Sequence, residues 1–259
     1  MPDAARGEDF SAKLPRREME GERDPSSRSE NGGECFMCQA HFQKAVASGP
    51  PSRNSVEIWR FPDISGGEEL LDTEEKRRLD AYRSPTARRL FLSGRAGVRL
   101  VAARYCGLAP GSFRVRCDER GKPAFIGQPD LHFNLSHSGD VALAAFSGAP
   151  VGLDIECRGR SRDFAAIARR FFLPEEAEAV LRSGENREDV FLKIWTAKEA
   201  IVKLSGKGLA GGLALARTTP DGQGFLGDQA VWLRHFLSDG YHGTAASFLP
   251  FEVKGWFDL

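Results

Sequence analysis

The chain has 259 residues, of which 41% are hydrophobic and 28% charged, enough for the core of one large domain or of two small ones. Lysine plus arginine and aspartate plus glutamate each number 36, so the formal net charge is zero. This balance excludes a global basic field that would recruit nucleic acid or an anionic membrane surface. The sequence has no run of about 18 apolar residues, which excludes an ordinary transmembrane helix.

The cysteines and the first residues indicate a reducing compartment. Five cysteines lie scattered at positions 35, 38, 106, 117 and 157, an odd number that does not look like a disulfide framework. The segment from Met1 to Arg6 lacks the basic-then-apolar order of a secretory signal. We therefore expect a cytoplasmic protein.

Residues 1–54 are rich in Arg, Glu, Ser, Gly and Pro and show no sustained apolar period. We expect a largely disordered N-terminal extension with one short helix between His41 and Ala47. Cys35, Cys38 and His41 offer at most three metal ligands, and no zinc-finger spacing is completed downstream. An unstructured tail with incidental cysteines is favoured over a zinc site.

The folded part is predicted to begin with a strand and two helices. Alternating apolar residues predict a strand over 55–61. Asp72 followed by Glu75 predicts one helix start, and Ser84 followed by Pro85 predicts the next. Four further strands are predicted at 113–117, 131–135, 141–146 and 151–155. Because short turns separate the last three, we expect them to form an antiparallel meander.

The second half begins with helices and ends with strands. Helices are predicted over 164–172, 174–184 and 187–204, followed by strands near 231–233 and 245–248. Each half thus runs from helices to strands. We expect an α+β fold of two similar α/β lobes, an N-terminal lobe over 55–150 and a C-terminal lobe over 151–259.

Three acidic residues carry the first functional signal. Asp154 and Glu156 lie two apart in a predicted strand and share one face, while Leu153 and Ile155 point into the core. Two carboxylates on one face repel each other unless a cation lies between them. The helix over 187–204 adds Glu199, with Lys203 one turn later and both off its apolar stripe. Three hard oxygen ligands beside lysines suit Mg²⁺ and a phosphate-bearing substrate.

Each signal also has an ordinary structural explanation. Asp154 and Glu156 could lie on a solvated edge strand, although the surrounding Val, Leu and Ile favour a metal site. Glu199 and Lys203 alone are a common helix-stabilising pair. The loop from Ser136 to Gly139 contains His137 between two serines, a set of donors for phosphate, but small polar residues are also typical of turns.

In their order along the chain, several segments resemble the Sfp-type 4′-phosphopantetheinyl transferases. The resemblance spans about residues 56–220, and the acid pair stands about forty residues before the helical acid. The matching segments are Gly121-Lys122-Pro123, Phe133-Asn134-Leu135-Ser136-His137-Ser138-Gly139, Val151-Gly152-Leu153-Asp154-Ile155-Glu156, Phe171-Phe172 with Glu175-Glu176, Trp195-x-x-Lys198-Glu199-Ala200-x-x-Lys203 and Gly206-Lys207-Gly208-Leu209. Ala200 departs from the family, many members of which have Ser there.

The resemblance implies a Mg²⁺-dependent transfer of the phosphopantetheine arm of coenzyme A to a serine of an apo acyl or peptidyl carrier protein, with release of 3′,5′-ADP. By this resemblance Asp154, Glu156 and Glu199 hold Mg²⁺. Ser136, His137 and Lys122 contact the 3′-phosphate of coenzyme A, and Lys198 and Lys203 contact phosphates. Glu199 would be the base, and Lys203 is favoured over Lys198 as the acid.

The same resemblance implies two lobes related by pseudo-twofold symmetry, with coenzyme A between them, in a monomer that binds neither nucleic acid nor membrane. The products served would be polyketides, nonribosomal peptides or fatty acids. Two alternatives stay open. One is a Mg²⁺-dependent phosphohydrolase that uses the same acids with water. The other is a coenzyme A-binding module without catalysis, against which the intact acid triplet argues.

Overall fold

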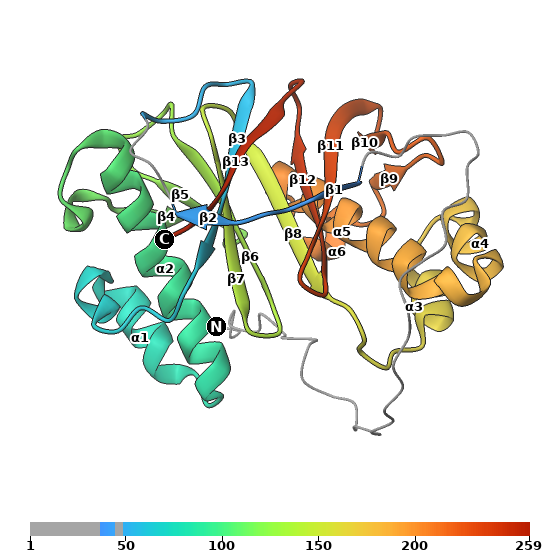
Figure 1. Cartoon of the computed structure of the whole chain (residues 1–259), viewed down its shortest axis with the longest axis horizontal. Helices are drawn as coiled ribbons and strands as arrows, with labels where there is room; N and C mark the ends of the chain where they lie inside the picture. The colour runs from blue at the N-terminus through green and yellow to red at the C-terminus, as the bar shows by residue number, and fades with distance from the viewer. Residues whose placement is uncertain (1–36, 45–48) are drawn as a thin grey trace. The chain divides into compact units, whose positions relative to one another are not determined.

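Two β-sheets form the centre of the computed structural model, which describes residues 37–44 and 49–259 (Figure 1). The N-lobe sheet has the strand order β2-β13-β3-β7-β6, and the C-lobe sheet has the order β8-β12-β11-β10-β9 with β1 beside β11. The strands of the N-lobe sheet are β2 (Gln43–Lys44), β13 (Glu252–Asp258), β3 (Ser55–Phe61), β7 (Val141–Ser147) and β6 (His132–Ser138). Those of the C-lobe sheet are β8 (Val151–Cys157), β12 (Tyr241–Ser247), β11 (Gln229–Ser238), β10 (Gly224–Leu226), β9 (Ala216–Thr218) and β1 (Met37–Gln39). β4 (Val115–Cys117) and β5 (Pro123–Phe125) form a separate hairpin.

Helices cover the outer faces of both sheets, and the inner faces pack on each other. Figure 1 shows the N-lobe helices on one side of the sheets and the C-lobe helices on the other. The helices of four or more residues are α1 (Thr73–Ala81), α2 (Pro85–Cys106), α3 (Phe164–Phe171), α4 (Pro174–Arg182), α5 (Arg187–Ser205), α6 (Leu209–Gly212) and the 3-10 helix Gly67–Leu70. Between the sheets lie side chains that include Ile58, Leu143, Leu153, Ile155 and Phe236. The α+β class and the inward direction of Leu153 and Ile155 are confirmed.

Capping residues explain why the long helices begin and end where they do. Asp72 and Glu75 form a reciprocal capping box at α1. Ser84 accepts a hydrogen bond from the third residue of α2, which then starts with a proline. Gly107 and Gly206 end α2 and α5 in the left-handed region, at φ 66° and 67°, where a side chain would be strained.

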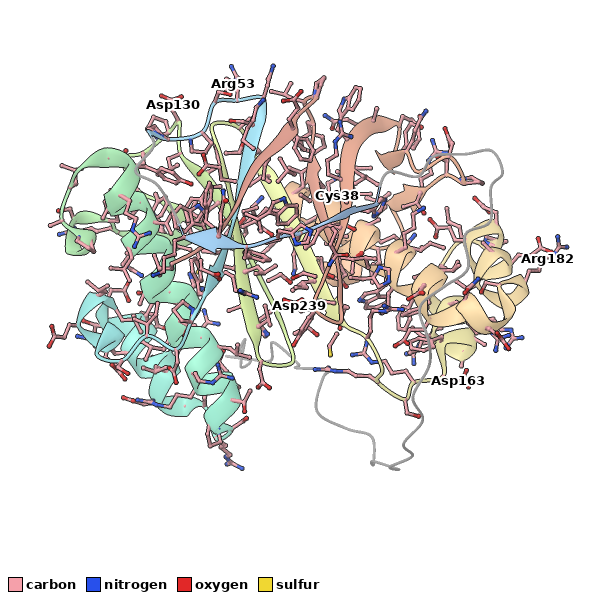
Figure 2. The ribbon with its side chains drawn as sticks, viewed as in Figure 1. Cys38, Arg53, Asp130, Asp163, Arg182 and Asp239 are labelled. Atoms are coloured by element: carbon pink, nitrogen blue, oxygen red, sulfur yellow. The ribbon has the colours of Figure 1, made fainter. Side chains whose placement is uncertain are left out.

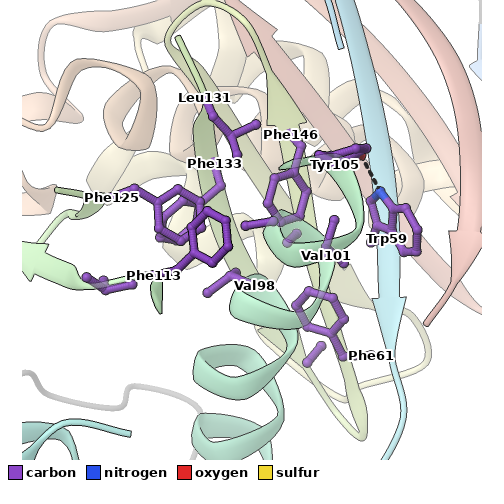
Figure 3. Packing of buried hydrophobic residues seen from close by; sticks show 14 of the residues in the cluster. Trp59, Phe61, Val98, Val101, Tyr105, Phe113, Phe125, Leu131, Phe133 and Phe146 are labelled. Atoms are coloured by element: carbon purple, nitrogen blue, oxygen red, sulfur yellow. Dashed lines mark hydrogen bonds between the residues drawn. The ribbon is translucent and has the colours of Figure 1, made fainter. Parts of the chain in front are cut away.

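An aromatic core lies between α2 and the N-lobe sheet. Figure 3 shows Phe125, Phe133 and Phe146 packed with Val98 and Val101 of the helix. Phe125 and Phe133 have ring centroids 4.5 Å apart. This core fixes β6 and β7, and therefore also fixes the polar side chains that β6 presents on its other face.

The prediction of a three-stranded meander is wrong in its last strand. β6 and β7 pair antiparallel, but β8 leaves for the other sheet and pairs with β12. The crossing occurs at Gly148–Pro150. Gly148 lies against the backbone of residues 51–53, where a side chain would not fit, and Pro150 lacks the N–H that would continue the ladder with β7.

The two ends of the described chain also depart from expectation. β13 pairs in parallel with β3, so the last strand of the chain completes the N-lobe sheet. β1 and β2 extend one sheet each, and Cys38 of β1 is labelled in Figure 2. The predicted helix from His41 is therefore wrong over residues 41–44, where β2 begins, while 45–48 and the extension over 1–36 lie outside the described residues.

Side chains of β6 join the edges of the two sheets. Asn134, Ser136 and Ser138 alternate along β6, and each accepts a hydrogen bond from a backbone N–H of β8, at 2.9, 3.2 and 3.0 Å. These bonds replace the missing backbone ladder between the two strands. We call this contact the β6–β8 seam.

The structure bears on the expectations about disulfides and membrane-spanning helices. The four cysteines of the described residues are all free. No helix in residues 37–44 and 49–259 combines the length and apolar character that crossing a bilayer requires.

Candidate active site

Asp154 lies at the β6–β8 seam with one carboxylate oxygen occupied and the other without a partner. Its Oδ1 accepts hydrogen bonds from Ser136 Oγ at 2.9 Å and Lys203 Nζ at 2.7 Å. Its Oδ2 is buried and accepts none from the residues that the structure describes. An unsatisfied buried carboxylate oxygen is costly, so this atom marks a place where a cation or donor fits.

Glu156 repeats the pattern one position along the same face of β8. Its Oε2 accepts a hydrogen bond from Ser138 Oγ at 3.0 Å and forms an ion pair with Arg162 at 3.3 Å. Burial and the nearby Asp154 raise the pKa of Glu156, and Arg162 offsets part of this rise. Ser136 and Ser138 thus each hold one acid while bonding the backbone of β8.

The helix α5 brings Glu199 and Lys203 to the two strand acids because β8 has a glycine beneath it. A side chain at Gly152 would overlap the Ala200 carbonyl and the backbone of Leu204. Only a strand without a Cβ at this position permits so close an approach. The glycine at 152 therefore permits the short distance between the helix and the acid pair.

Glu199 is buried rather than off the core as the helical stripe had predicted, with 6% of its surface exposed. Burial, together with repulsion from Asp154 and Glu156, raises its pKa to about 8, and Lys203 offsets part of the rise. The three acids therefore form one electrostatic unit. Such a unit suits either a bound cation or a base kept at high proton affinity.

The donor set fits a divalent ion, but the side chains are not arranged as a ready-made ligand cage. Within the described residues, no three His, Cys, Asp or Glu side chains form a group that could hold a metal ion. Lys203 instead occupies Asp154 Oδ1. The oxygen chemistry, the unpartnered Oδ2 and the mutual repulsion of the acids are nevertheless what a hard cation such as Mg²⁺ would satisfy.

The prediction that Lys198 contacts coenzyme A conflicts with its surroundings. Its side chain is 1% exposed, and its Nζ lies 2.8 Å from Glu176 Oε2. The same ammonium donates to the carbonyl of Ala216. Lys198 therefore anchors α5 to α4 and β9 inside the C-terminal lobe, and its charge is not presented to a ligand.

The three residues predicted for the 3′-phosphate do not form one cluster. Ser136 is buried in the seam, with 5% of its surface exposed. His137 is exposed and points to the opposite face of β6 from Ser136, because neighbours in a strand alternate.

Lys122 holds the end of α5 instead. Its Nζ donates to the Leu204 carbonyl at 2.8 Å, and burial lowers its pKa to about 8. It also lines a cavity of about 140 Å³ with residues that include His132 and Phe125. Pockets for drug-sized ligands are larger, about 300–1,000 Å³, so this cavity does not by itself hold coenzyme A.

Sequence reasoning missed Arg162, the bond of Ser138 to Glu156, and the role of Gly152 as the contact point for the helix. Ser138 had a signal, since Asn134, Ser136 and Ser138 are polar at period two in a strand whose other residues pack. Arg162 had no such signal, because it lies in a loop with several arginines, and the sequence does not show which of them pairs with Glu156.

Comparison with known proteins identifies the family of the chain. Residues 150–243, which contain Asp154, Glu156 and Glu199, match the profile of the 4′-phosphopantetheinyl transferase superfamily. The 4′-phosphopantetheinyl transferase HetI of Nostoc sp. is 35% identical over 169 residues, covering 61% of this chain and 71% of that protein.

Two relatives from Bacillus give the same result. The 4′-phosphopantetheinyl transferase psf-1 of Bacillus pumilus is 36% identical over 160 residues, 61% of this chain and 68% of that protein. The 4′-phosphopantetheinyl transferase Sfp of Bacillus subtilis is 34% identical over 154 residues, 54% of this chain and 67% of that protein. At these identities and over two thirds or more of each relative, the chain belongs to the Sfp-type 4′-phosphopantetheinyl transferase family.

Proposed function

We propose that this enzyme transfers the phosphopantetheine arm of coenzyme A to a serine hydroxyl of an apo carrier protein and releases 3′,5′-ADP. The observation that carries the proposal is the unit of Asp154, Glu156 and Glu199 beside Lys203, with Asp154 Oδ2 buried and without a partner among the described residues. These groups would hold Mg²⁺, which when bound supplies Lewis-acid stabilisation of pyrophosphate oxygens.

The chain's own residues supply the proton transfers. Burial and two neighbouring carboxylates make Glu199 a stronger base than an exposed glutamate. It takes the proton from the carrier serine as the serine oxygen forms its bond to the pantetheine-side phosphorus. The bond from that phosphorus to the bridging oxygen breaks, and 3′,5′-ADP leaves. Lys203 donates a hydrogen bond or its proton to the departing phosphate oxygen.

His137 and Lys122 remain our candidates for the 3′-phosphate of coenzyme A. His137 is exposed on β6, the edge strand of the N-lobe sheet, and Lys122 donates to the C-terminal end of α5 in the other lobe. For Lys122 to bind a phosphate, its ammonium must leave the Leu204 carbonyl. Ser136 instead serves the acid site directly through Asp154.

The proposal is tested by incubating the purified chain with coenzyme A, Mg²⁺ and several apo carrier proteins, and measuring the intact mass of each carrier. We expect a gain equal to the phosphopantetheine arm and an equal yield of 3′,5′-ADP. Release of 3′,5′-ADP without a carrier would favour the phosphohydrolase. Coenzyme A binding without product in any mixture would favour the non-catalytic module.

A further inference from the structure

Two of the three acids carry a cation that belongs to this chain. Lys203 Nζ lies 2.7 Å from Asp154 Oδ1, and an Nη of Arg162 lies 3.3 Å from Glu156 Oε2. The two cations come from different elements, since Lys203 is on α5 and Arg162 lies between β8 and α3. Glu199 has no directly bonded cation among the ion pairs of the described residues.

The serine partners of the acids are bonded to the backbone of β8, whereas the cationic partners are long side chains that remain partly exposed. Ser136 and Ser138 also accept hydrogen bonds from the β8 backbone, so their hydroxyl groups are held by the seam. Arg162 and Lys203 reach the acids through long side chains that stay 21% and 29% exposed. A long, partly exposed side chain exchanges partners at lower cost than a hydroxyl group built into a strand.

Charge balance indicates when this exchange occurs. With all three acids ionised, they face two cations of the chain. The net charge of these groups is then −1. A divalent ion added alone would change it to +1, whereas the two negative charges of a pyrophosphate would return it to −1. A guanidinium displaced from a carboxylate also matches phosphate oxygens well, because both anions accept paired N–H donors.

We propose that Arg162 is the exchangeable counter-ion of this site: it occupies Glu156 in the metal-free protein, opposes a divalent ion that arrives alone, and transfers to the pyrophosphate of coenzyme A when metal and coenzyme A bind together. The inference rests on the proposed function and deepens it. Metal and coenzyme A must then bind with positive cooperativity, and Arg162 must carry part of the coupling.

The test measures Mn²⁺ binding to the full chain by the paramagnetic resonance signal of free Mn²⁺, with and without coenzyme A and without any carrier. In Arg162→Gln we expect Mn²⁺ alone to bind about three- to tenfold more tightly than in the unmodified protein, since a competing positive charge is gone. We also expect coenzyme A to increase the Mn²⁺ affinity of this variant less.

Arg169→Gln is the matched control, because Arg169 is exposed in the last turn of α3 and is removed by the same chemical change. It should leave both Mn²⁺ affinities unchanged. Arg162→Lys keeps the positive charge and should restore weak binding of Mn²⁺ alone. If Arg162→Gln folds poorly, Arg162→Ala and Arg162→Lys are compared instead. Tighter Mn²⁺ binding in Arg162→Ala than in Arg162→Lys would show that the positive charge opposes the metal.

Unchanged or weaker binding of Mn²⁺ alone in Arg162→Gln overturns the inference, because the arginine would then be neutral or would orient Glu156 for the metal. That result leaves the proposed function standing if the unmodified chain still transfers the arm to a carrier. Conversely, coupled binding of Mn²⁺ and coenzyme A with no transfer would sink the proposed function and keep the counter-ion.

Discussion

In each lobe, a buried ion pair between a glutamate and a cationic side chain joins two helices. The position of the pair is the same in both lobes, and the cation differs. In the N-terminal lobe, Glu75 at the start of α1 lies 2.8 Å from Arg99 of α2. In the C-terminal lobe, Glu176 at the start of α4 lies 2.8 Å from Lys198 of α5. Each glutamate also accepts a hydrogen bond from the backbone N–H just before its own helix. The cations repeat the pattern, since Arg99 donates to the Phe113 carbonyl and Lys198 to the Ala216 carbonyl, beside the small strands.

The lobes differ in the carboxylate that lies beneath the long helix. Glu57 of β3 accepts a 2.6 Å hydrogen bond from Tyr105, which in turn accepts one from Trp59, as Figure 3 shows for the last pair. Asp154 of β8 is bonded to the partly exposed Lys203 and to Ser136, and its other oxygen has no partner among the described residues. The two lobes thus share an arrangement of helices and strands, but the carboxylate of the first lobe is hydrogen-bonded within a network of side chains, whereas that of the second keeps an oxygen for a ligand. This difference indicates which lobe carries the reaction.

The largest expected effect separates these two carboxylates. Asp154→Asn removes one charge from the acid unit, and we expect kcat/KM for transfer to fall by on the order of a thousandfold, as when a main electrostatic group is lost. The free energy of unfolding should change by less than about 1 kcal/mol, because the repulsion between buried acids decreases.

Glu57→Gln is the matched change in the other lobe. It should keep transfer within about twofold and lower the free energy of unfolding by about 1 kcal/mol, the value of one buried hydrogen bond. Mass-shift kinetics and urea unfolding measure both quantities on both variants. Equal loss of transfer in the two would mean that the difference between the lobes does not locate the active site.

The second prediction breaks the shared ion pair. Lys198→Met leaves Glu176 charged and buried without a cation, and we expect a loss of about 3–5 kcal/mol in the free energy of unfolding. Arg99→Met should cost less, because Arg95 remains 3.7 Å from Glu75. Urea unfolding measures the free energy of unfolding of both variants.

The double variant Lys198→Met with Glu176→Gln is the control, and it should recover part of the lost stability because no buried charge is left alone. The Lys198→Met protein that remains folded should keep its KM for coenzyme A. A KM raised tenfold with stability unchanged would restore Lys198 as a phosphate contact.

The sequence was informative where local chemistry decides the structure. Asp72, Ser84 and Gly206 mark helix ends by their own hydrogen bonds or dihedral angles, and period two places Asp154 and Glu156 on one face. The burial of Lys198 and Glu199 was not predictable in this way. Helical spacing gives the direction of a side chain, but α4, β8 and β9 decide which directions are covered, and these contacts are long-range. The return of β13 to the first sheet escaped prediction for the same reason.

The third prediction uses the matching hairpins β6–β7 and β11–β12. In the first, Leu135 faces Ala144, and in the second, His235 faces Thr244 at the equivalent register. Burial lowers the pKa of His235 to about 3, with smaller contributions from Lys193 and His242. The unfolded chain takes up a proton below about pH 6.5 and the folded chain does not, so stability falls as pH falls from 6.5 toward 3.

Between pH 6.5 and pH 5 this histidine should account for about 2 kcal/mol of lost stability. The double change His235→Leu with Thr244→Ala copies the first hairpin into the second and should remove that loss. Urea unfolding at the two pH values gives the difference, with His41→Asn as the control because His41 is exposed. A pH dependence equal to that of the unmodified chain would assign the acid sensitivity to other groups.

The smallest effect concerns the exposed end of β6, where His137 occupies the position that Leu237 has in β11. His137→Ala should raise KM for coenzyme A about tenfold, the value of one hydrogen bond to a charged phosphate, with little change in kcat. The readout is transfer kinetics with coenzyme A and with dephospho-coenzyme A, which lacks the 3′-phosphate. If both substrates lose equally, His137 does not contact the 3′-phosphate and acts through the N-lobe sheet. If only coenzyme A loses, the polar residue at this position marks the difference in function between two hairpins of the same geometry.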